Sequence, residues 1–497
     1  MADNGIKKRG FLADSSIYLS ANIISTAVGF ITLPIYTRFL SPADYGLVAL
    51  YMMFGQISSG LVSIGIHSAS YRFYFKYKDN PIAYKILNST NLLFLFIVYI
   101  IVGIGLYYST SWFSSNLFNG KITDALIILS FINGCINYLI NYTTLILTAQ
   151  LRSVTFSTII IFQALLRVAF SLYFIFMNSM TYLALIYATI FTNIIIIVLL
   201  LFLVRQTLGI HFSLSSLRKS LLFSYPTTPI KTVGLVYSSF DKIMLNKYIG
   251  LNSVGYYNFG QKFGSILKMV MNSVGKVWSP FFLENAHLNT KKAQNIIVHR
   301  FYELAFIYMI FGLGIIYFSE EMIKILTIKE FYPSMYIVPI YVYFYFFSII
   351  GTIIVPQLLF VEKMIYRLPI SVVSVIMNIA LNVLLIPRFG AIGAAIATTL
   401  SQLMVSIVGI YLSQRVYPLP IGILKLIRLY TILLIFTIPV YPIMALSINF
   451  FLKIVIKLSI ILLFIWVGIK MKHISLKYFS DTFSRLSGRS LSLIWLL

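Results

Sequence analysis

The sequence predicts an all-α polytopic membrane protein with about 14 transmembrane helices. Of its 497 residues, 59% are hydrophobic and only 10% are charged, whereas about a quarter of the residues in soluble domains are charged. Apolar stretches of about 20 residues, long enough to cross a hydrocarbon core of about 30 Å, recur along the whole chain. Such stretches form helices, because their backbone polar groups find no water in the lipid. A soluble fold is therefore excluded.

The individual spans follow from hydropathy in windows of about 19 residues. Longer loops are expected only at residues 72–85, 283–297 and 319–333. The first span follows Lys7, Lys8 and Arg9 and is longer than a signal-peptide core, so we expect a retained helix. The predicted spans are residues 15–36, 45–69, 86–109, 122–148, 154–177, 181–204, 221–246, 254–282, 298–318, 334–361, 368–386, 390–412, 426–447 and 451–469.

The sequence lacks the motifs of metal, redox and nucleotide chemistry. Cys135 is the only cysteine, which excludes disulfides within the chain and cysteine metal clusters. The five histidines form no HExxH pattern, and no Gly-rich phosphate loop of the P-loop type occurs. We therefore expect no metal site and no cofactor.

Membrane topology explains most of the net charge of +25. If the N-terminus is cytoplasmic, 24 of the 38 Lys and Arg residues fall on the cytoplasmic side, where membrane proteins concentrate cations. We therefore expect both termini in the cytoplasm and no nucleic-acid partner. Nine cations fall toward the opposite side: Arg38, Lys121, Lys242, Lys247, Lys324, Lys329, Arg388, Lys453 and Lys457. Five remain within the spans: Arg167, Lys231, Lys262, Lys268 and Lys276.

An internal repeat is visible at an offset of 209 residues. The segment from Arg38 to Gly46 aligns with the segment from Lys247 to Gly255. Six spans separate equivalent positions, so the two halves share one orientation and are related by an axis along the membrane normal. The predicted parts are an N-terminal lobe of six helices at residues 1–204, a C-terminal lobe of six helices at 205–412, two appended helices at 413–469 and a basic cytoplasmic tail at 470–497.

The span 254–282 carries three of the five intramembrane cations on one face. At about 100° per residue, Lys262, Lys268 and Lys276 fall within an arc of about 120°. A cation at the bilayer centre costs about 2.5–3.5 kcal/mol on insertion scales. We therefore expect this face to line a water-filled cavity that holds an anionic ligand. The alternative is that Lys262 and Lys276 extend to the membrane interface, which leaves only Lys268 at depth.

The span 221–246 has a polar stripe that contains Lys231, and it also contains Pro226 and Pro229. Two prolines within one turn remove backbone donors and bend a helix. We therefore expect this helix to bend.

Two carboxylates are candidates for coupling transport to an ion. They are Asp241, at the margin of the same polar stripe, and Glu303, in the span 298–318. The alternative for Asp241 is an ion pair at the membrane interface with Lys242 or Lys247.

Amide side chains form rows on two helices of the first lobe. Asn133, Asn137 and Asn141 recur at every fourth position of one predicted helix, and Gln163 and Arg167 share this spacing in the next. Amides that face a cavity can hydrogen-bond sugar hydroxyls. The alternative is that they form polar contacts between helices.

Three segments resemble those of a known family. They are Leu33-Pro-Ile-Tyr-Thr-Arg-Phe-Leu-Ser-Pro-Ala-Asp-Tyr-Gly46, Asp241-Lys-Ile-Met-Leu245 followed by Val254-Gly-Tyr-Tyr257, and Phe389-Gly-Ala-Ile-Gly-Ala-Ala-Ile-Ala-Thr-Thr-Leu400. They resemble the bacterial polysaccharide transporters, the Wzx-type O-antigen flippases of the multidrug/oligosaccharidyl-lipid/polysaccharide (MOP) flippase superfamily.

The resemblance implies two six-helix bundles that flip an undecaprenyl-diphosphate-linked oligosaccharide, the repeat unit of O-antigen or a related surface glycan. Translocation from the cytoplasmic to the periplasmic leaflet of the inner membrane would proceed by alternating access. Expected partners are this glycan lipid, the phospholipid bilayer, the glycan polymerase machinery and H⁺ or Na⁺. The expected substrate-binding residues are Lys268, Lys231, Lys262, Lys276, Arg167, Arg38, Asn141 and Asn137.

Two other functions fit the sequence less well than a flippase does. A multidrug or cation antiporter of the same superfamily is expected to have a more acidic cavity, whereas here the intramembrane cations outnumber the acids. A glycan polymerase or ligase is expected to have a large outward loop with clustered acid, base or Arg residues, and the predicted outward loops are short. We therefore expect a transporter and not an enzyme.

Overall fold

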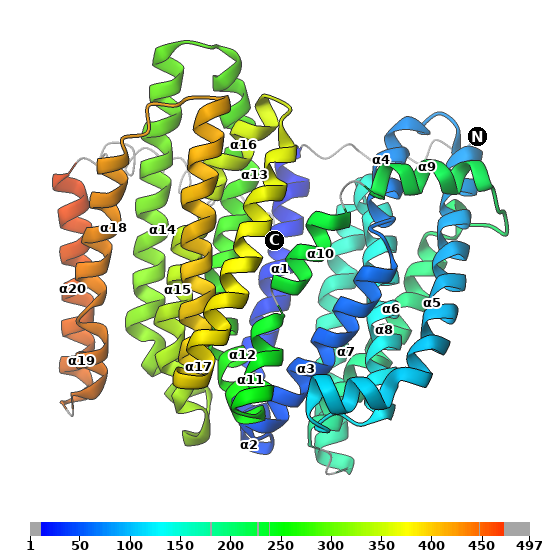
Figure 1. The fold of residues 1–497 in the computed structure, drawn as a ribbon, viewed down its shortest axis with the longest axis horizontal. Helices are drawn as coiled ribbons and strands as arrows, with labels where there is room; N and C mark the ends of the chain where they lie inside the picture. Colours follow the sequence, from blue (N-terminus) through cyan, green and yellow to red (C-terminus); the bar gives the residue numbers. More distant parts are fainter. Residues whose placement is uncertain (1–10, 179–180, 226–227, 238, 447, 472–497) are drawn as a thin grey trace, which may run out of the picture. The chain divides into compact units, whose positions relative to one another are not determined.

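The computed structural model describes residues 11–178, 181–225, 228–237, 239–446 and 448–471. Within these residues every regular element is a helix, and 11 helices are long and apolar enough to cross a membrane (Figure 1). The chain is therefore an all-α multi-pass membrane protein, which confirms the predicted fold class. The predicted tail lies outside the described residues from residue 472 onward.

The chain divides into two compact units. Unit 1 comprises Met1–Phe259, Ile325–Pro333 and Ser371–Ala397, and unit 2 comprises Gly260–Lys324, Ser334–Ile370 and Thr398–Leu497. The lobe boundaries expected from the sequence remain a prediction.

Unit 1 is built mainly from the N-terminal helices. Within it, α3 packs against α6, and α7 packs against both α1 and α8. Its helices are α1 (Phe11–Ile31), α2 (Leu33–Phe39), α3 (Pro42–Val62), α4 (His67–Lys76), α5 (Pro81–Phe118), α6 (Asp124–Ala149), α7 (Ser153–Asn178), α8 (Tyr182–Leu203), η1 (Arg205–Thr207), α9 (Leu214–Ser224), α10 (Thr228–Tyr237), α11 (Phe240–Tyr248) and most of α12 (Leu251–Gly264).

The start of α3 is fixed by its own sequence. The Ser41 side chain accepts a hydrogen bond from the Asp44 backbone N–H at 3.2 Å, and the Asp44 carboxylate accepts one from the Ser41 backbone N–H at 2.9 Å. This capping box satisfies two backbone donors that a helix start otherwise leaves free. Pro42 follows at the first helical position, where its missing N–H costs nothing.

The two glycines that the repeat aligns meet at a crossing of α3 with α12. A Cβ atom on Gly46 would lie 2.1 Å from the Leu251 carbonyl oxygen, and one on Gly255 would lie 1.9 Å from the Pro42 carbonyl oxygen. Leu251 is 209 residues after Pro42, and Gly255 is 209 residues after Gly46. The contact is therefore reciprocal, as two repeats related by a two-fold axis require.

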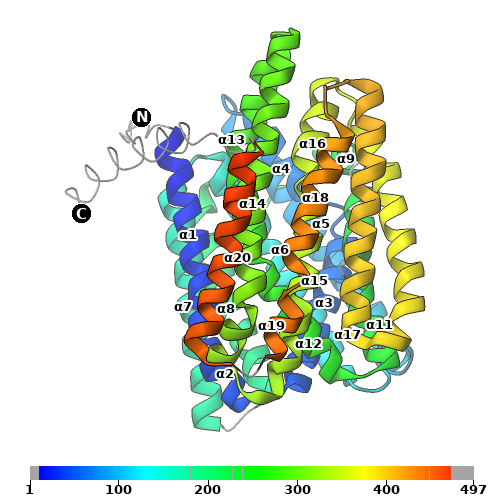
Figure 2. The ribbon, with the colours of Figure 1, turned by 90° about the vertical axis from the view of Figure 1, so that its left-hand side faces the viewer.

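Unit 2 contains the remaining helices. In Figure 2, α20 lies alongside α14. The elements are α13 (Ile266–His287), α14 (Lys291–Leu326), η3 (Lys329–Tyr336), α15 (Ile337–Ser348), α16 (Gly351–Phe360), η4 (Met364–Tyr366), α17 (Arg367–Val416), α18 (Ile423–Thr437), α19 (Val440–Ala445) and α20 (Phe450–Lys470), with η3 and α17 lying partly in unit 1.

The predicted spans 368–386 and 390–412 appear as the single element α17. Gly390 interrupts its helical backbone with φ of 55° and ψ of −131°. A Cβ atom on Gly393 would lie 2.4 Å from the Leu385 carbonyl oxygen, whereas residues eight apart in a straight helix are separated by about 12 Å. The chain therefore reverses direction at Gly390, and α17 holds two helices.

Two other predicted spans are divided into shorter helices. The span 221–246 contains the end of α9, all of α10 and most of α11, and the span 254–282 contains parts of α12 and α13. Pro226, which was expected to bend the first of them, lies outside the described residues. The helices α9 to α12 have 11, 10, 9 and 14 residues, so each is too short to cross a membrane by itself, and α13 is not among the 11 candidate spans either.

The predicted loop 319–333 is wrong in its first half, because α14 continues to Leu326. Its 36 residues correspond to about 54 Å of helix, which exceeds the apolar thickness of a membrane of about 30 Å. The last turns of α14 carry Glu320, Glu321 and Lys324, which lower the hydropathy of this segment. Glu320 and Glu321 are nevertheless buried, beside lysines of α20.

Candidate functional site

A polar cavity of about 990 Å³ lies within unit 1. This volume is at the upper end of the range of about 300–1,000 Å³ typical of ligand pockets. Its walls come from α1, α3, α4, α6, α7 and α10. The lining residues that carry polar side chains are Asn22, Gln56, Ser59, His67, Asn133, Asn137, Tyr138, Asn141, Thr144, Thr148, Thr228 and Thr232.

The α6 wall of the cavity is the asparagine row that the sequence predicts. Asn133, Asn137 and Asn141 all line it. The Asn141 side-chain amide donates a hydrogen bond to the Asn137 side-chain oxygen at 3.2 Å, and both side chains are exposed. Each retains donor and acceptor capacity for a ligand.

The Asn133 side chain is oriented by a hydrogen bond from a second amide, that of Asn193. Gln163 donates to the Asn193 side-chain oxygen at 3.1 Å, and Asn193 donates to the Asn133 side-chain oxygen at 2.9 Å. Asn193 is fully buried. The relay fixes the orientation of Asn133 and leaves its amino group near the Met52 sulfur, at 3.8 Å, on the cavity wall. The sequence did not single out Asn193, because one asparagine in an apolar helix has no periodic partner.

His67 and Tyr138 form a pair on the cavity wall that the sequence analysis also missed. The His67 Nδ1 atom and the Tyr138 hydroxyl are 2.5 Å apart. Tyr138 follows Asn137 and precedes Asn141 by three residues, so helical spacing places it on the same face. His67 had no such signal, because it belongs to the short helix α4 and its contact to α6 is tertiary.

The cavity wall is free of strongly charged side chains among the residues that the structure describes. No Asp, Glu, Lys or Arg occurs in that part of the lining. The predicted cation Lys231 lies on α10 between Thr228 and Thr232, which line the cavity, but its side chain is outside the described part.

The other predicted cations of unit 1 do not line this cavity. Arg167 is exposed on α7, seven residues after Ile160, which is a lining residue. This spacing corresponds to about 10 Å along the helix. Arg38 is exposed in the last turn of α2.

The three lysines predicted for one face belong to unit 2. Lys262 lies near the end of α12 and is partly exposed, and Lys268 is exposed on α13. The side chain of Lys276 is outside the described residues. Gln261, which precedes Lys262, donates a hydrogen bond to the Tyr341 hydroxyl at 2.5 Å.

The two candidate ion-coupling carboxylates lie in different environments. Asp241 is buried in unit 1, accepts a hydrogen bond from the Tyr257 hydroxyl, and accepts a second from the Lys242 backbone N–H at 2.9 Å. Glu303 is half-buried on α14 and pairs with Arg300 at 2.6 Å and with His299 at 3.4 Å. Groups of three or more His, Cys, Asp or Glu that could hold a metal do not occur among the described residues.

A further group of charges, unexpected from the sequence, joins α14 to α20. Glu320 and Glu321 are buried beside Lys453 and Lys457. The sequence placed these lysines toward helix ends and the glutamates in a loop, because no local pattern connects residues more than 130 positions apart.

The family model for polysaccharide biosynthesis proteins matches residues 11–286, more than half of the chain. No curated protein matches the chain in sequence.

Solved structures share the fold. A lipid II flippase in an inward closed conformation has a TM-score of 0.72 at 16% identity, over 91% of this chain and 98% of its own. An inward-facing multidrug transporter of the MOP superfamily has a TM-score of 0.65 at 13% identity, over 81% of this chain and 97% of its own. A MOP superfamily transporter from Pyrococcus furiosus, described as having a binding pocket of reverse polarity, has a TM-score of 0.54 at 14% identity, over 81% and 94%.

The solved structures are described as a flippase and as transporters, and at 13–16% identity the likeness shows the fold that this chain shares with them. The chain belongs to the polysaccharide biosynthesis protein family.

Proposed function

We propose that the chain translocates an undecaprenyl-diphosphate-linked oligosaccharide, the repeat unit of O-antigen or a related surface glycan. It moves this lipid from the cytoplasmic to the periplasmic leaflet of the inner membrane by alternating access. The observation that carries this proposal is the chemistry of the polar cavity, whose described wall combines apolar and glycine residues with 12 polar side chains, all of them amides, hydroxyls or an imidazole. These groups both donate and accept hydrogen bonds, as sugar hydroxyls do. The cavity therefore suits the glycan part of the lipid.

The diphosphate is assigned to the cations outside this wall. A diphosphate forms charge-assisted hydrogen bonds with ammonium and guanidinium groups, and these strengthen as water is excluded. Lys268 is the leading candidate because it is exposed, and no carboxylate in the described part of the chain pairs with it. Lys231, Lys262, Lys276, Arg167 and Arg38 are the supporting candidates.

A multidrug or cation antiporter is the second candidate function. A cationic substrate would need a carboxylate on the cavity wall to offset its charge. The described wall has none, and the buried Asp241 is engaged by Tyr257 and the Lys242 backbone. This chemistry favours the glycan.

Asp241 is the better of the two candidates for coupling to H⁺ or Na⁺. Its burial makes the cost of its charge high, so that binding of a cation is favourable. Glu303 already pairs with Arg300 at 2.6 Å, and the His299 ring nitrogen lies 3.4 Å from its other oxygen; such pairs between neighbouring turns of one helix are common.

The proposed orientation has both termini in the cytoplasm, and the glycan polymerase machinery is the proposed protein partner. Lys121, which is exposed between α5 and α6, then faces the periplasm. A Lys121→Cys variant in a Cys135→Ala background should react with a membrane-impermeant thiol reagent added from outside. Labelling of the Lys121→Cys variant only after the cells are opened would reverse the orientation.

The test of glycan recognition uses the double variant Asn137→Leu/Asn141→Leu. Leucine keeps the approximate volume and removes the hydrogen-bonding groups, each worth about 0.5–1.5 kcal/mol. The purified protein is titrated with a polyprenyl diphosphate carrying an oligosaccharide and with the same lipid without sugar. We expect the wild type to prefer the glycosylated lipid by about 10-fold or more, and the variant to lose this preference while binding the sugar-free lipid unchanged.

The matched control is Asn116→Leu, since Asn116 is exposed on α5 away from the cavity. This control should retain the preference and should support normal glycan export in cells whose own copy of the gene is deleted. Equal preference in the wild type and the double variant would show that the cavity does not bind the glycan.

A further inference from the structure

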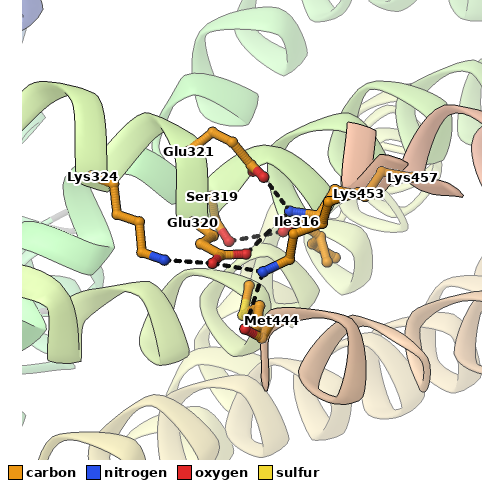
Figure 3. Close-up of polar contacts among 8 residues, drawn as sticks. All are labelled: Ile316, Ser319, Glu320, Glu321, Lys324, Met444, Lys453 and Lys457. Atoms are coloured by element: carbon orange, nitrogen blue, oxygen red, sulfur yellow. Dashed lines mark hydrogen bonds and ion pairs between the residues drawn. The ribbon is translucent and has the colours of Figure 1, made fainter. Parts of the chain in front are cut away.

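Five charged side chains form a cluster between α14 and α20 within unit 2, drawn in Figure 3. Glu320 accepts hydrogen bonds from Lys324 at 2.7 Å and from Lys453 at 2.8 Å on one oxygen, and from Lys457 at 3.3 Å on the other. Glu321 accepts from Lys457 at 2.6 Å. We call these five residues the α14–α20 charge cluster.

The core of the cluster is buried and balanced in charge. Glu320, Glu321, Lys453 and Lys457 are each at most 9% exposed, so two anions face two cations away from solvent. Lys324 is the peripheral member, with 45% of its side chain exposed. Lys453 also donates to the Met444 carbonyl of α19 at 3.1 Å, which ties the end of α19 to the same site.

The two lysines are unfavourable for α20 taken alone. A lysine within an apolar helix is costly to insert, and Lys453 lies in the first turn of α20, where the helix dipole disfavours a cation. The expected topology adds a third cost, since both lysines fall on the side that is poor in cations. The carboxylates of α14 are the charged groups that offset these costs among the described residues.

We propose that the α14–α20 charge cluster fixes the register of α20 on α14, so that the C-terminal helices are a constant part of unit 2 during transport. Lys453 and Lys457 are one helical turn apart, and Glu320 and Glu321 are adjacent. A slide of one turn, about 5.4 Å, leaves one lysine buried without a carboxylate.

The apolar part of the interface does not impose the same register. Phe306 of α14 stacks on Phe464 of α20 with ring centroids 4.7 Å apart, and it also contacts the backbone position of Gly468. Apolar contacts of this kind are tolerant of repacking, whereas a buried unpaired charge is not. A polar group that sets register at a buried helix interface is the best-attested use of such charges.

Cysteine crosslinking measures the register directly. In a Cys135→Ala background, the pair Phe306→Cys/Gly468→Cys reports the native register, and Phe306→Cys/Ile460→Cys reports a slide of about two turns, because positions 460 and 468 are eight residues apart. With the cluster intact, we expect copper-phenanthroline to crosslink only the first pair. With Glu320→Gln/Glu321→Gln added, the second pair should also crosslink, and the unfolding temperature in detergent should fall.

A charge exchange keeps the test decisive if the glutamine variant fails to fold. Glu321→Lys alone should reduce the native crosslink, and adding Lys457→Glu should restore it, because the exchange recreates the pair. The proposal would be overturned if the charge exchange did not restore the native crosslink. It would also be overturned if the Glu320→Gln/Glu321→Gln variant gave the same crosslinks as the parent.

The functional consequence has its own measurement, which rests on the proposed flippase activity. If α20 stays on α14 throughout the cycle, the disulfide between positions 306 and 468 should leave glycan export at the level of the reduced protein. Loss of export that reduction restores would show that the two helices separate during transport. The register result stands apart from this assay, so a wrong substrate assignment would not affect it.

Discussion

Replacing Gly255 with alanine tests the close crossing of α3 and α12. This crossing brings together Gly46 and Gly255, the two glycines that the internal repeat aligns. The new Cβ atom would lie 1.9 Å from the Pro42 carbonyl oxygen, 2.8 Å from its carbonyl carbon and 3.2 Å from its Cα. An ordinary contact begins near 3.4 Å, so the helices must separate by about 1.5 Å at this point. The obstacle is backbone, which no rotamer change relieves. Forcing extra volume into a packed contact costs about 1–3 kcal/mol.

A second effect of the same substitution has the opposite sign. Alanine is favoured over glycine within a helix by about 1 kcal/mol. Gly105→Ala in α5 isolates this effect, because no atom lies within 4 Å of the added Cβ. The control should therefore be as stable as the parent or slightly more stable. The difference between Gly255→Ala and Gly105→Ala then gives the cost of the crossing alone, about 1–3 kcal/mol.

The assay is the apparent unfolding temperature of the purified protein in detergent, together with glycan export at matched protein level. Gly255→Ala should unfold at a lower temperature than Gly105→Ala and export less. Gly46→Ala, whose Cβ would lie 2.1 Å from the Leu251 carbonyl oxygen, should behave like Gly255→Ala. The double variant should lose less than the sum of the two, because either change already separates the helices. A Gly255→Ala protein that matches Gly105→Ala in both measurements would refute the crossing.

Two further predictions concern the charged candidates. Lys268→Ala should abolish glycan export at normal protein level while Lys268→Arg retains part of it, since the charge is kept and the geometry changes. Lys329→Ala, at an exposed position of η3, is the control, and equal export by Lys268→Ala and this control would remove Lys268 from the binding site. Asp241→Asn can still accept the Tyr257 hydrogen bond but lacks the charge, so it should fold normally and lose the dependence of transport on H⁺ or Na⁺. Glu303→Gln should retain that dependence, and a retained dependence in Asp241→Asn would exclude Asp241 as the coupling group.

Periodicity predicted the parts of the site that lie on one helix. The asparagines of α6 recur every fourth residue, and all of them line the cavity. The parts that depend on contacts between helices had no such signal. Asn193 reaches Asn133 across 60 residues of sequence, and His67 reaches Tyr138 across 71. Side-chain spacing carries no information about a partner on another helix.

Hydropathy predicted the spans well where an apolar helix is uninterrupted, and poorly where turns divide it. None of the helices from α9 to α13 is among the candidate spans, and α9 to α12 are too short to cross a membrane alone. At Gly390 the two predicted spans 368–386 and 390–412 agree with the structure, because the chain reverses there and α17 holds two helices. In both cases the sequence predicted the helices, and the turn geometry required the structure.

The α14–α20 charge cluster also bears on how the expected topology is counted. The prediction of cytoplasmic termini rests on 24 cations on one side against nine on the other. Three of those nine, Lys324, Lys453 and Lys457, are hydrogen-bonded to Glu320 or Glu321. The positive-inside rule is not a net-charge rule, since acidic residues contribute little to it, so ion pairing alone does not remove a cation from the count. Lys453 and Lys457 are removed for another reason, because they are buried against α14 and do not lie in a loop. Seven cations then stand against 24, so the asymmetry on which the predicted orientation depends is retained.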